Sequence, residues 1–177
     1  VYLAHTLEET ARMAVDLANG DPVRDNYCDP IDYEVSRPLA ADKTVKGLYS
    51  GGSLAAEAGM LIAEALNLGG LIKEEGYILK TGGYEVVDLG DDVYTQGKPH
   101  PMIDPEVRIK KILECAKDPQ TGVILLDCML GYGCHPDMAG ALAPAIREAQ
   151  EIAKADGREL YFVASVCGTR QDPQDYD

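Results

Sequence analysis

Basic side chains are scarce in this chain of 177 residues. Lysine and arginine together number 16, whereas aspartate and glutamate number 30, which gives a formal net charge of −14 at pH 7. Such a surface repels the phosphates of nucleic acids and of anionic lipids, so we expect no nucleic-acid partner and no membrane contact. A local anion site remains open to the chain, because backbone amides bind anions without basic side chains.

Long apolar runs and paired cysteines are also missing. No run approaches the roughly 20 residues that cross a bilayer. The cysteines are odd in number and form no CxxC motif; they are Cys28, Cys115, Cys128, Cys134 and Cys167. We interpret them as reduced thiols of a cytoplasmic protein, in preference to a disulfide set or a zinc site.

The chain begins at Val1 and is almost at once in a helical pattern. Thr6 and Glu9 have the spacing of a capping box, and Gly20 followed by a proline ends a helix predicted over 6–20. Residues 21–43 have no clear period, so we expect 1–43 to be a helix with an extended arm. Residues 44–177 form the main domain, and we expect the whole to be a piece of a longer protein.

Strand and helix patterns alternate from Thr44 onward. The predicted strands are 45–49, 85–89, 122–129 and 160–166, and the predicted helices are 54–68, 105–117 and 136–155. The run GVILLDCM at 122–129 is nearly all apolar, which is typical of a strand buried on both faces. This alternation predicts an α/β fold, a doubly wound and mainly parallel sheet with helices on both faces. Residues 69–84 fit either a short helix or a hairpin.

Unusual residues gather where these strands end. Ligands of open parallel sheets bind at the carboxyl ends of the strands, near a topological switch point. The loops expected there are 50–53, 88–92, 131–137 and 167–170. Two of them are glycine-rich and open a helix, where free N–H groups and the helix dipole favour an anion. Neither fits GxGxxG or GxxxxGK[ST], so a dinucleotide or P-loop site is weakly supported, and plain turn geometry remains an alternative.

Several side chains near these loops could carry chemistry. His135 lies at the expected N-cap of the last helix, where it suits a general acid or a phosphoryl acceptor, although a capping or surface histidine is as ordinary. Cys134 beside it would have a lowered thiol pKa at a helix N-terminus. His100, between two prolines, could reach a substrate or partner. Asp127 stands inside the apolar strand, where a charge needs a partner or a raised pKa.

Acidic residues crowd the loop after the second strand. Asp88, Asp91 and Asp92 offer the oxygen ligands that Mg²⁺ prefers. Three carboxylates are also ordinary in so acidic a chain. The sequence alone therefore leaves both a cation site and a solvated loop open at 88–92.

Five blocks of the sequence resemble the FdrA family, whose members are similar to fused succinyl-CoA synthetase subunits. The matching blocks are 47–54 (GLYSGGSL), 87–91 (VDLGD), 98–105 (KPHPMIDP), 125–136 (LLDCMLGYGCHP) and 164–169 (ASVCGT). They occur in order over most of 44–172. The segment resembles the ligase domain of the synthetase β subunit, which implies a flavodoxin-like fold.

The resemblance also implies a phosphate site. In the synthetases the last helix points its N-terminus at a phosphohistidine carried by the α-type ligase domain. The implied phosphate-binding residues are Ser50, Gly51, Gly52, Ser53, Gly131, Tyr132, Gly133 and Cys134, with His135 as the candidate catalytic residue. Asp88, Asp91 and His100 are the implied contacts to a substrate or partner. No metal ion or cofactor is expected in this segment beyond phosphate as a ligand.

The chain departs from the synthetase pattern in ways that limit its activity. Tyr132 replaces the second glycine of a Gly-Gly pair, Pro136 has no N–H to donate, and the phosphohistidine motif Gly-His-Ala-Gly is missing. The resemblance implies that the α-type ligase and CoA-binding domains of the parent chain are partners, and that the parent uses CoA, ATP or GTP, and Mg²⁺. We expect a homodimer as well.

Two alternatives stand beside an acyl-CoA synthetase domain. The resemblance also points to an oxamate carbamoyltransferase-type enzyme that handles carbamoyl phosphate. The other alternative is a non-catalytic assembly module, in which Tyr132 fills the former phosphate pocket.

Overall fold

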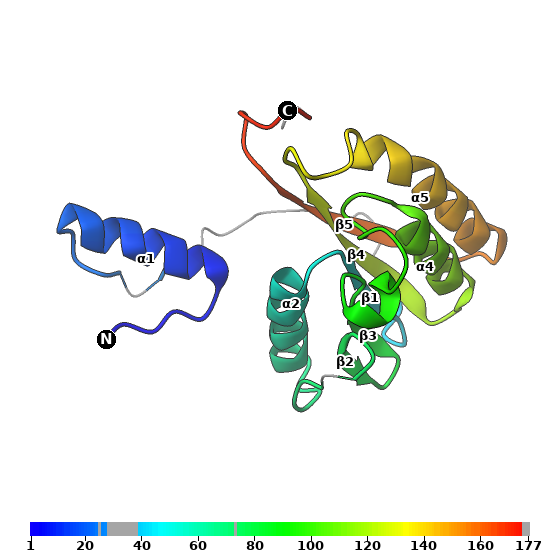
Figure 1. Cartoon of the computed structure of the whole chain (residues 1–177). Helices are drawn as coiled ribbons and strands as arrows, with labels where there is room; N and C mark the ends of the chain where they lie inside the picture. Colours follow the sequence, from blue (N-terminus) through cyan, green and yellow to red (C-terminus); the bar gives the residue numbers. More distant parts are fainter. Residues whose placement is uncertain (25, 28–38, 73, 175–177) are drawn as a thin grey trace. The chain divides into compact units, whose positions relative to one another are not determined.

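The computed structural model describes residues 1–24, 26–27, 39–72 and 74–174. It divides the chain into two compact units, Val1–Pro38 and Leu39–Asp177 (Figure 1). Much of the predicted arm, with Cys28, lies outside the described residues. No helix in the described part of the chain is long and apolar enough to cross a membrane.

The first unit contains helix α1 (Leu7–Asn19), and its predicted capping box is confirmed. The Thr6 hydroxyl accepts the N–H of Glu9 at 3.1 Å, and the Glu9 carboxylate accepts the N–H of Thr6 at 3.2 Å. Gly20 ends the helix in the left-handed conformation, with φ of 80°, which glycine adopts at little cost.

The second unit is built on one five-stranded sheet with the order β2-β3-β1-β4-β5. The strands are β1 (Thr44–Tyr49), β2 (Tyr77–Thr81), β3 (Tyr84–Asp88), β4 (Thr121–Met129) and β5 (Tyr161–Cys167). All neighbours are parallel except β2, which runs antiparallel to β3. The mainly parallel sheet is therefore confirmed, and the segment 69–84 contributes a hairpin rather than a helix. Gly82 and Gly83 form its tip, both with positive φ, as a two-residue hairpin turn requires.

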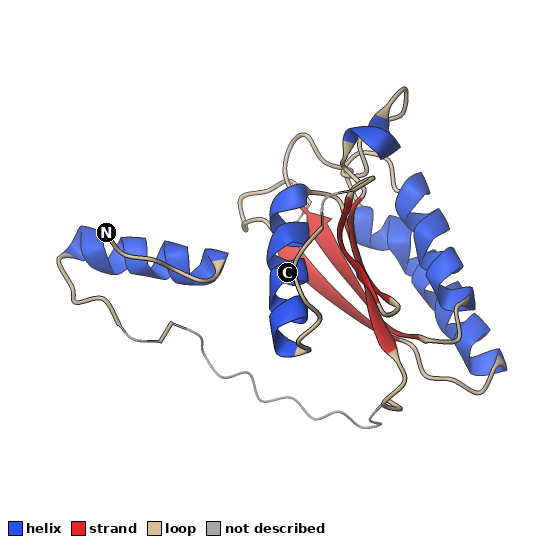
Figure 2. Ribbon diagram, turned by 90° about the horizontal axis from the view of Figure 1, so that it is seen from below, coloured by secondary structure: helices blue, strands red, loops and turns tan. Residues whose placement is uncertain are grey.

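Helices cover both faces of this sheet, as predicted for a doubly wound fold. Helix α2 (Gly52–Ala65) packs against β1, β2 and β3, whereas α4 (Glu106–Lys117) and α5 (Met138–Ala155) lie together on the opposite face (Figures 1 and 2). A four-residue helix, α3 (Asp92–Thr95), follows β3. One apolar cluster fills the space between the sheet and α4 and α5, and a second lies under α2.

The predicted starts of α2, α4 and α5 are wrong by one or two residues. Helix α2 begins at Gly52, two residues earlier than predicted. Helix α5 begins at Met138 and not at Pro136, and its N-cap is Asp137 and not His135. The reason is chemical, because the Asp137 carboxylate accepts the N–H of Gly140 at 2.8 Å, a bond typical of the best capping residues. Helix α4 begins at Glu106, one residue later than predicted, with Pro105 as its N-cap.

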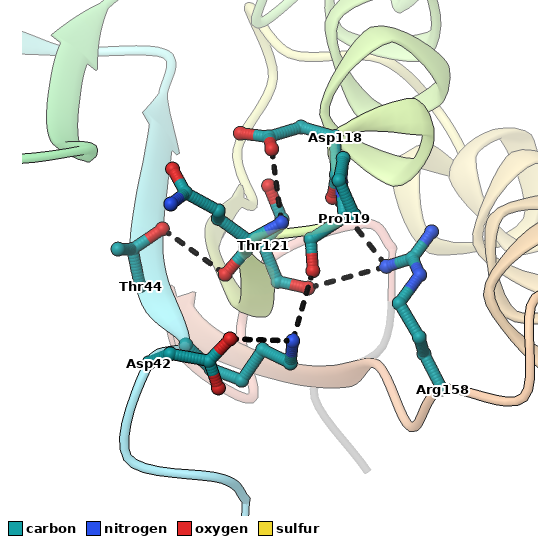
Figure 3. Close-up of polar contacts among 8 residues, drawn as sticks. Asp42, Thr44, Asp118, Pro119, Thr121 and Arg158 are labelled. Atoms are coloured by element: carbon teal, nitrogen blue, oxygen red, sulfur yellow. Dashed lines mark hydrogen bonds and ion pairs between the residues drawn. The ribbon is translucent and has the colours of Figure 1, made fainter.

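A polar cluster fixes the loop between α4 and β4, at the amino ends of the strands (Figure 3). Arg158 donates to the carbonyl oxygens of Ala116, Asp118 and Thr121 at 2.7, 3.4 and 3.5 Å. Lys43 donates to the Pro119 carbonyl at 3.1 Å. These cations satisfy carbonyls left over at the C-terminus of α4. The amino edge of the sheet is thus occupied by structural contacts, which leaves the carboxyl edge for ligands.

Candidate functional site

The two glycine loops follow the two adjacent strands at the topological switch point of the sheet. Strands β1 and β4 are parallel neighbours, with Leu48 opposite Leu126. The chain leaves β1 toward α2 on one face and leaves β4 toward α5 on the other (Figure 2). Loops 50–53 and 131–134, predicted from separate parts of the sequence, therefore lie at the ends of adjacent strands, where open α/β sheets bind ligands.

A buried carboxylate clamps the first loop to β4. The backbone N–H of Ser50 donates to both carboxylate oxygens of Asp127 at 3.0 Å, and the Ser50 hydroxyl donates to Oδ2 at 2.9 Å. Ser50 is fully buried and Asp127 is 1% exposed. The prediction that Asp127 needs a partner is confirmed. Both donors of Ser50 are committed to this carboxylate, so the donors that can face a ligand begin at Gly51.

Arg108, on α4, is the third residue of this cluster and contacts Asp127 from the helix side of β4. The sequence did not predict this role. Arg108 Nη2 lies 3.0 Å from Asp127 Oδ1 and also donates to the Asp127 main-chain carbonyl. Arg108 is 0% exposed, and its Nε and Nη1 have no partner among the described residues. Burial lowers the pKa of the Arg108 guanidinium, while Asp127 opposes that shift. An aspartate in an apolar strand was the signal that a buried cation should be sought nearby.

The end of β3 packs directly against the same loop. Asp88 Oδ1 accepts the N–H of Gly90 at 2.8 Å. A Cβ added to Gly90 would lie 2.6 Å from His100 Nε2 and 2.7 Å from the Ser50 carbonyl oxygen. A Cβ added to Gly52 would lie 2.9 Å from Asp88 Oδ2. The structure therefore brings Asp88 and His100 beside the start of α2. That they contact a bound group stays a prediction.

Asp91 and Asp92 have other surroundings. The Asp91 carboxylate accepts the N–H of Val93 at 3.0 Å and caps α3. Within the described segments, no group of three His, Cys, Asp or Glu side chains is arranged to hold a metal ion. In the described segments Asp88, Asp91 and Asp92 therefore do not converge on one ion position.

Asp88 gives the site a pH dependence. Burial raises the pKa of its carboxyl above 3.8, with further increases from Asp91 and Asp127; the N–H of Gly90 and His100 oppose them. A carboxyl with a raised folded pKa favours folding in its protonated form, so its contribution is lost as the pH rises through that pKa. We therefore expect the melting temperature of Asp88→Asn to rise relative to that of the wild type as the pH increases from acid to neutral. Asp92→Asn, at an exposed neighbouring residue, is the control. If the melting-temperature difference between Asp88→Asn and wild type did not change with pH, the raised pKa of Asp88 would be contradicted.

The second loop is occupied by another part of the chain. The N–H of Gly131 donates to Gln174 Oε1 at 2.9 Å, and Gln174 Nε2 donates to the Gly131 carbonyl at 2.6 Å. Tyr132 is 89% exposed. The idea that Tyr132 fills a former phosphate pocket is therefore wrong, because the side chain seated on the loop is that of Gln174.

His135 joins two loops at this edge. Its backbone N–H donates to the Met102 carbonyl at 2.8 Å, and its Nδ1 accepts the N–H of Asp137 at 3.0 Å. With Nδ1 acting as an acceptor, the proton of the neutral ring is carried by Nε2. The neutral imidazole thus carries its N–H donor on the ring nitrogen that does not contact Asp137.

Cys134 does not have the surroundings of a reactive thiol. It lies before the N-cap of α5 and outside the helix. Burial raises its pKa, and the nearby Asp172 raises it further. The prediction of a thiol pKa lowered by a helix N-terminus is wrong here. The four cysteines that the structure describes, Cys115, Cys128, Cys134 and Cys167, are all free.

A separate cleft of about 400 Å³ lies between α4 and the segment that precedes it. Its charged lining residues are Lys98, Lys110, Lys111, Asp104, Glu106 and Glu114. The three lysines are offset by three carboxylates, so the cleft is not a general anion site. The switch-point loops remain the better candidate.

A doubly wound sheet with two glycine loops converging at its switch point defines a flavodoxin-like α/β domain. Residues 48–177, more than half of the chain, match the CoA-ligase family, and the chain belongs to that family. It is thus a ligase domain of the succinyl-CoA synthetase type. The chain is also 37% identical over 155 residues to the uncharacterized protein YahF of Escherichia coli (strain K12). That alignment covers 79% of this chain and 30% of YahF, so the chain spans less than a third of that relative.

Proposed function

We propose that this is the ligase-type domain of an FdrA-like acyl-CoA synthetase of the ADP- or GDP-forming type. Its part in the reaction is to bind a phosphoryl group through main-chain amides at the switch point. CoA, the nucleotide and Mg²⁺ would be held by other domains of the parent protein. The domain would stabilise developing charge on the phosphoryl oxygens and would not supply the nucleophile.

The observation that carries this proposal is the start of helix α2. Its N-cap is Gly51, and no side chain in the described part of the chain caps it. The first N–H groups of a helix have no partner within the helix, and the dipole makes this end positive. The Asp127 clamp fixes Ser50 immediately before it. The amides of Gly52 and Ser53 are therefore held in place and are not capped by a side chain, although the Asp88 carboxylate lies beside Gly52, 2.9 Å from the position that a Cβ there would take.

At the start of α5, main-chain donors already have partners, so of the two predicted loops the one at α2 is the better candidate for phosphate. The Asp137 carboxylate already takes a first-turn N–H there, and Gly131 is paired with Gln174. Phosphate binding in the conformation described here is thus best supported at 51–53. Asp88, beside Gly52, has a pKa that an approaching anion would raise further.

A proline at Gly52 tests this assignment without breaking the helix. Gly52 is the first residue of α2, where proline is well tolerated, and the extended Gly51 (φ −156°, ψ 144°) suits a residue before proline. Gly52→Pro removes one N–H, and we expect phosphate binding to weaken at least about tenfold, because a hydrogen bond to a charged group contributes about 1.5–3 kcal/mol. The matched control is Gly52→Ala, which introduces the same contact with Asp88 but keeps the N–H.

The measurement is an amide NMR titration of the 177-residue chain with inorganic phosphate, with chloride at matched ionic strength as reference. Saturable shifts should appear at Gly52 and Ser53 and should be absent from the distant Gly157. Equal affinities of Gly52→Pro and Gly52→Ala would place phosphate elsewhere. The absence of a saturable shift at 51–53 in the wild type would refute the proposal.

A further inference from the structure

The segment that follows β5 returns to the Gly131 loop and seats a side chain on it. The Gln174 carboxamide pairs with the main chain of Gly131, accepting the N–H of Gly131 at 2.9 Å and donating to its carbonyl oxygen at 2.6 Å. The same Nε2 donates to the His135 carbonyl at 3.3 Å. The one amide donor of Gly131 is thereby taken, and two carbonyls of the loop are held by the carboxamide.

The segment is shaped for this position by its own hydrogen bonds. Asp172 Oδ2 accepts from the N–H of Thr169 at 2.6 Å and from its hydroxyl at 3.2 Å, while the N–H of Asp172 donates to the Thr169 carbonyl at 3.0 Å. This tight turn directs Pro173 and Gln174 back over the loop. There they line, with Gly131, Tyr132, Cys134 and Pro136, a small cavity of about 150 Å³.

The turn also brings a negative charge to the loop. Asp172 Oδ1 lies 4.0 Å from the position that a Cβ on Gly131 would take, and the carboxylate contributes to the raised pKa of the Cys134 thiol. A phosphoryl group that approached Gly131 would meet this carboxylate and two carbonyl oxygens. It would find no free amide at Gly131.

We propose that residues 169–174 form a latch that closes the Gly131 loop against anions, and that the latch must leave before a phosphoryl group can bind there. This inference rests on the proposed function, because it regulates the second half of the same phosphate site. Release of Gln174 frees the Gly131 N–H, and movement of the turn takes Asp172 away. In the closed state the Gly131 N–H is not available to phosphate, whereas the α2 start is.

Two variants open the latch in different ways. Gln174→Ala removes the carboxamide, and Asp172→Asn removes the charge and weakens the turn. Gln171→Ala is the control, because this exposed residue lies in the same segment and only its backbone N–H makes a bond in the turn, to the Thr169 hydroxyl at 3.2 Å. Hydrogen exchange of the Gly131 amide reports the latch directly. It should accelerate at least about tenfold in Gln174→Ala, because a lost hydrogen bond of this kind removes that protection.

The phosphate titration then reports anion access. In the wild type and in Gln171→Ala, shifts should be confined to 51–53. In Gln174→Ala and Asp172→Asn, saturable shifts should also appear at Gly131 and Cys134. If Gly131 exchanges at the wild-type rate in Gln174→Ala, or if phosphate still leaves its amide unmoved, the latch proposal is overturned. A wild-type chain that shows no shift at 51–53 refutes the proposed function instead, and the exchange rate of Gly131 still decides whether the latch exists.

Discussion

Asp127→Asn is expected to lower the free energy of unfolding by about 3–5 kcal/mol. The substitution leaves the Arg108 guanidinium buried without a counter-charge, and Arg108 is 0% exposed. It also turns one acceptor of the Ser50 donors into an NH₂ group that competes with them. The change should be visible as an earlier transition in chemical denaturation followed by circular dichroism.

A double variant separates the charge from the hydrogen bonds. Arg108→Met removes the cation and keeps most of the side-chain volume, and the carboxamide introduced by Asp127→Asn would still offer one oxygen to Ser50. Adding Arg108→Met to Asp127→Asn should therefore restore a large part of the lost stability, because a neutral buried pair destabilises the fold less than a single buried charge without a partner. If the stability losses of the single variants Asp127→Asn and Arg108→Met simply added in the double variant, the ion pair would not be the source of the loss in Asp127→Asn.

Gly90→Ala is expected to have the second largest effect, and it acts at the ligand edge itself. The new methyl group would lie 2.7 Å from the Ser50 carbonyl oxygen, a backbone atom that cannot move without its loop. We expect a loss of roughly 1–3 kcal/mol from overpacking. Phosphate shifts at Gly52 and Ser53 should also be lost, because the loop that precedes them is displaced. Thermal denaturation and the amide titration measure the two effects separately.

Gly133→Ala is the matched control for that experiment. Gly133 also belongs to a predicted phosphate loop, but a Cβ added there meets nothing within 4 Å. Its stability should stay within about 0.5 kcal/mol of wild type, as for an ordinary surface substitution. A large loss in Gly133→Ala, or none in Gly90→Ala, would contradict the packing described for this edge.

Local patterns in the sequence were enough to predict the four parallel strands and most helices, whereas the antiparallel strand β2 lies in a segment that fitted either a helix or a hairpin. The apolar run 122–129 lies in the interior strand β4, and the Thr6 and Glu9 capping box begins α1 as predicted. The predicted start of α5 was wrong because several neighbouring residues, among them His135 and Asp137, are possible N-cap residues. Which of them caps it depends on the bond from Gly140 to Asp137, a distance that no local pattern contains.

The missing parts of the site have a common cause. Arg108 looks like one more charged residue on an amphipathic helix, and its burial follows from Asp127, 19 residues away. Gln174 lies in a polar terminal stretch, and its partner Gly131 is 43 residues away. Contacts made across the fold by ordinary residue types leave no periodic signal. The loops could therefore be predicted from the sequence, whereas what holds them could not.

The clamp between Ser50 and Asp127 also bears on how the domain folds. It joins residues 77 positions apart, between strands that are neighbours in space but not along the chain. We expect contacts that close so long a loop to form late in folding, because other contacts formed in the same step must offset the entropy of closing the loop. We therefore expect that the carboxyl edge of the sheet, where Ser50 and Asp127 meet, cannot form from local contacts alone. During synthesis it can assemble only after β4 has emerged, in the same cooperative step that closes the core.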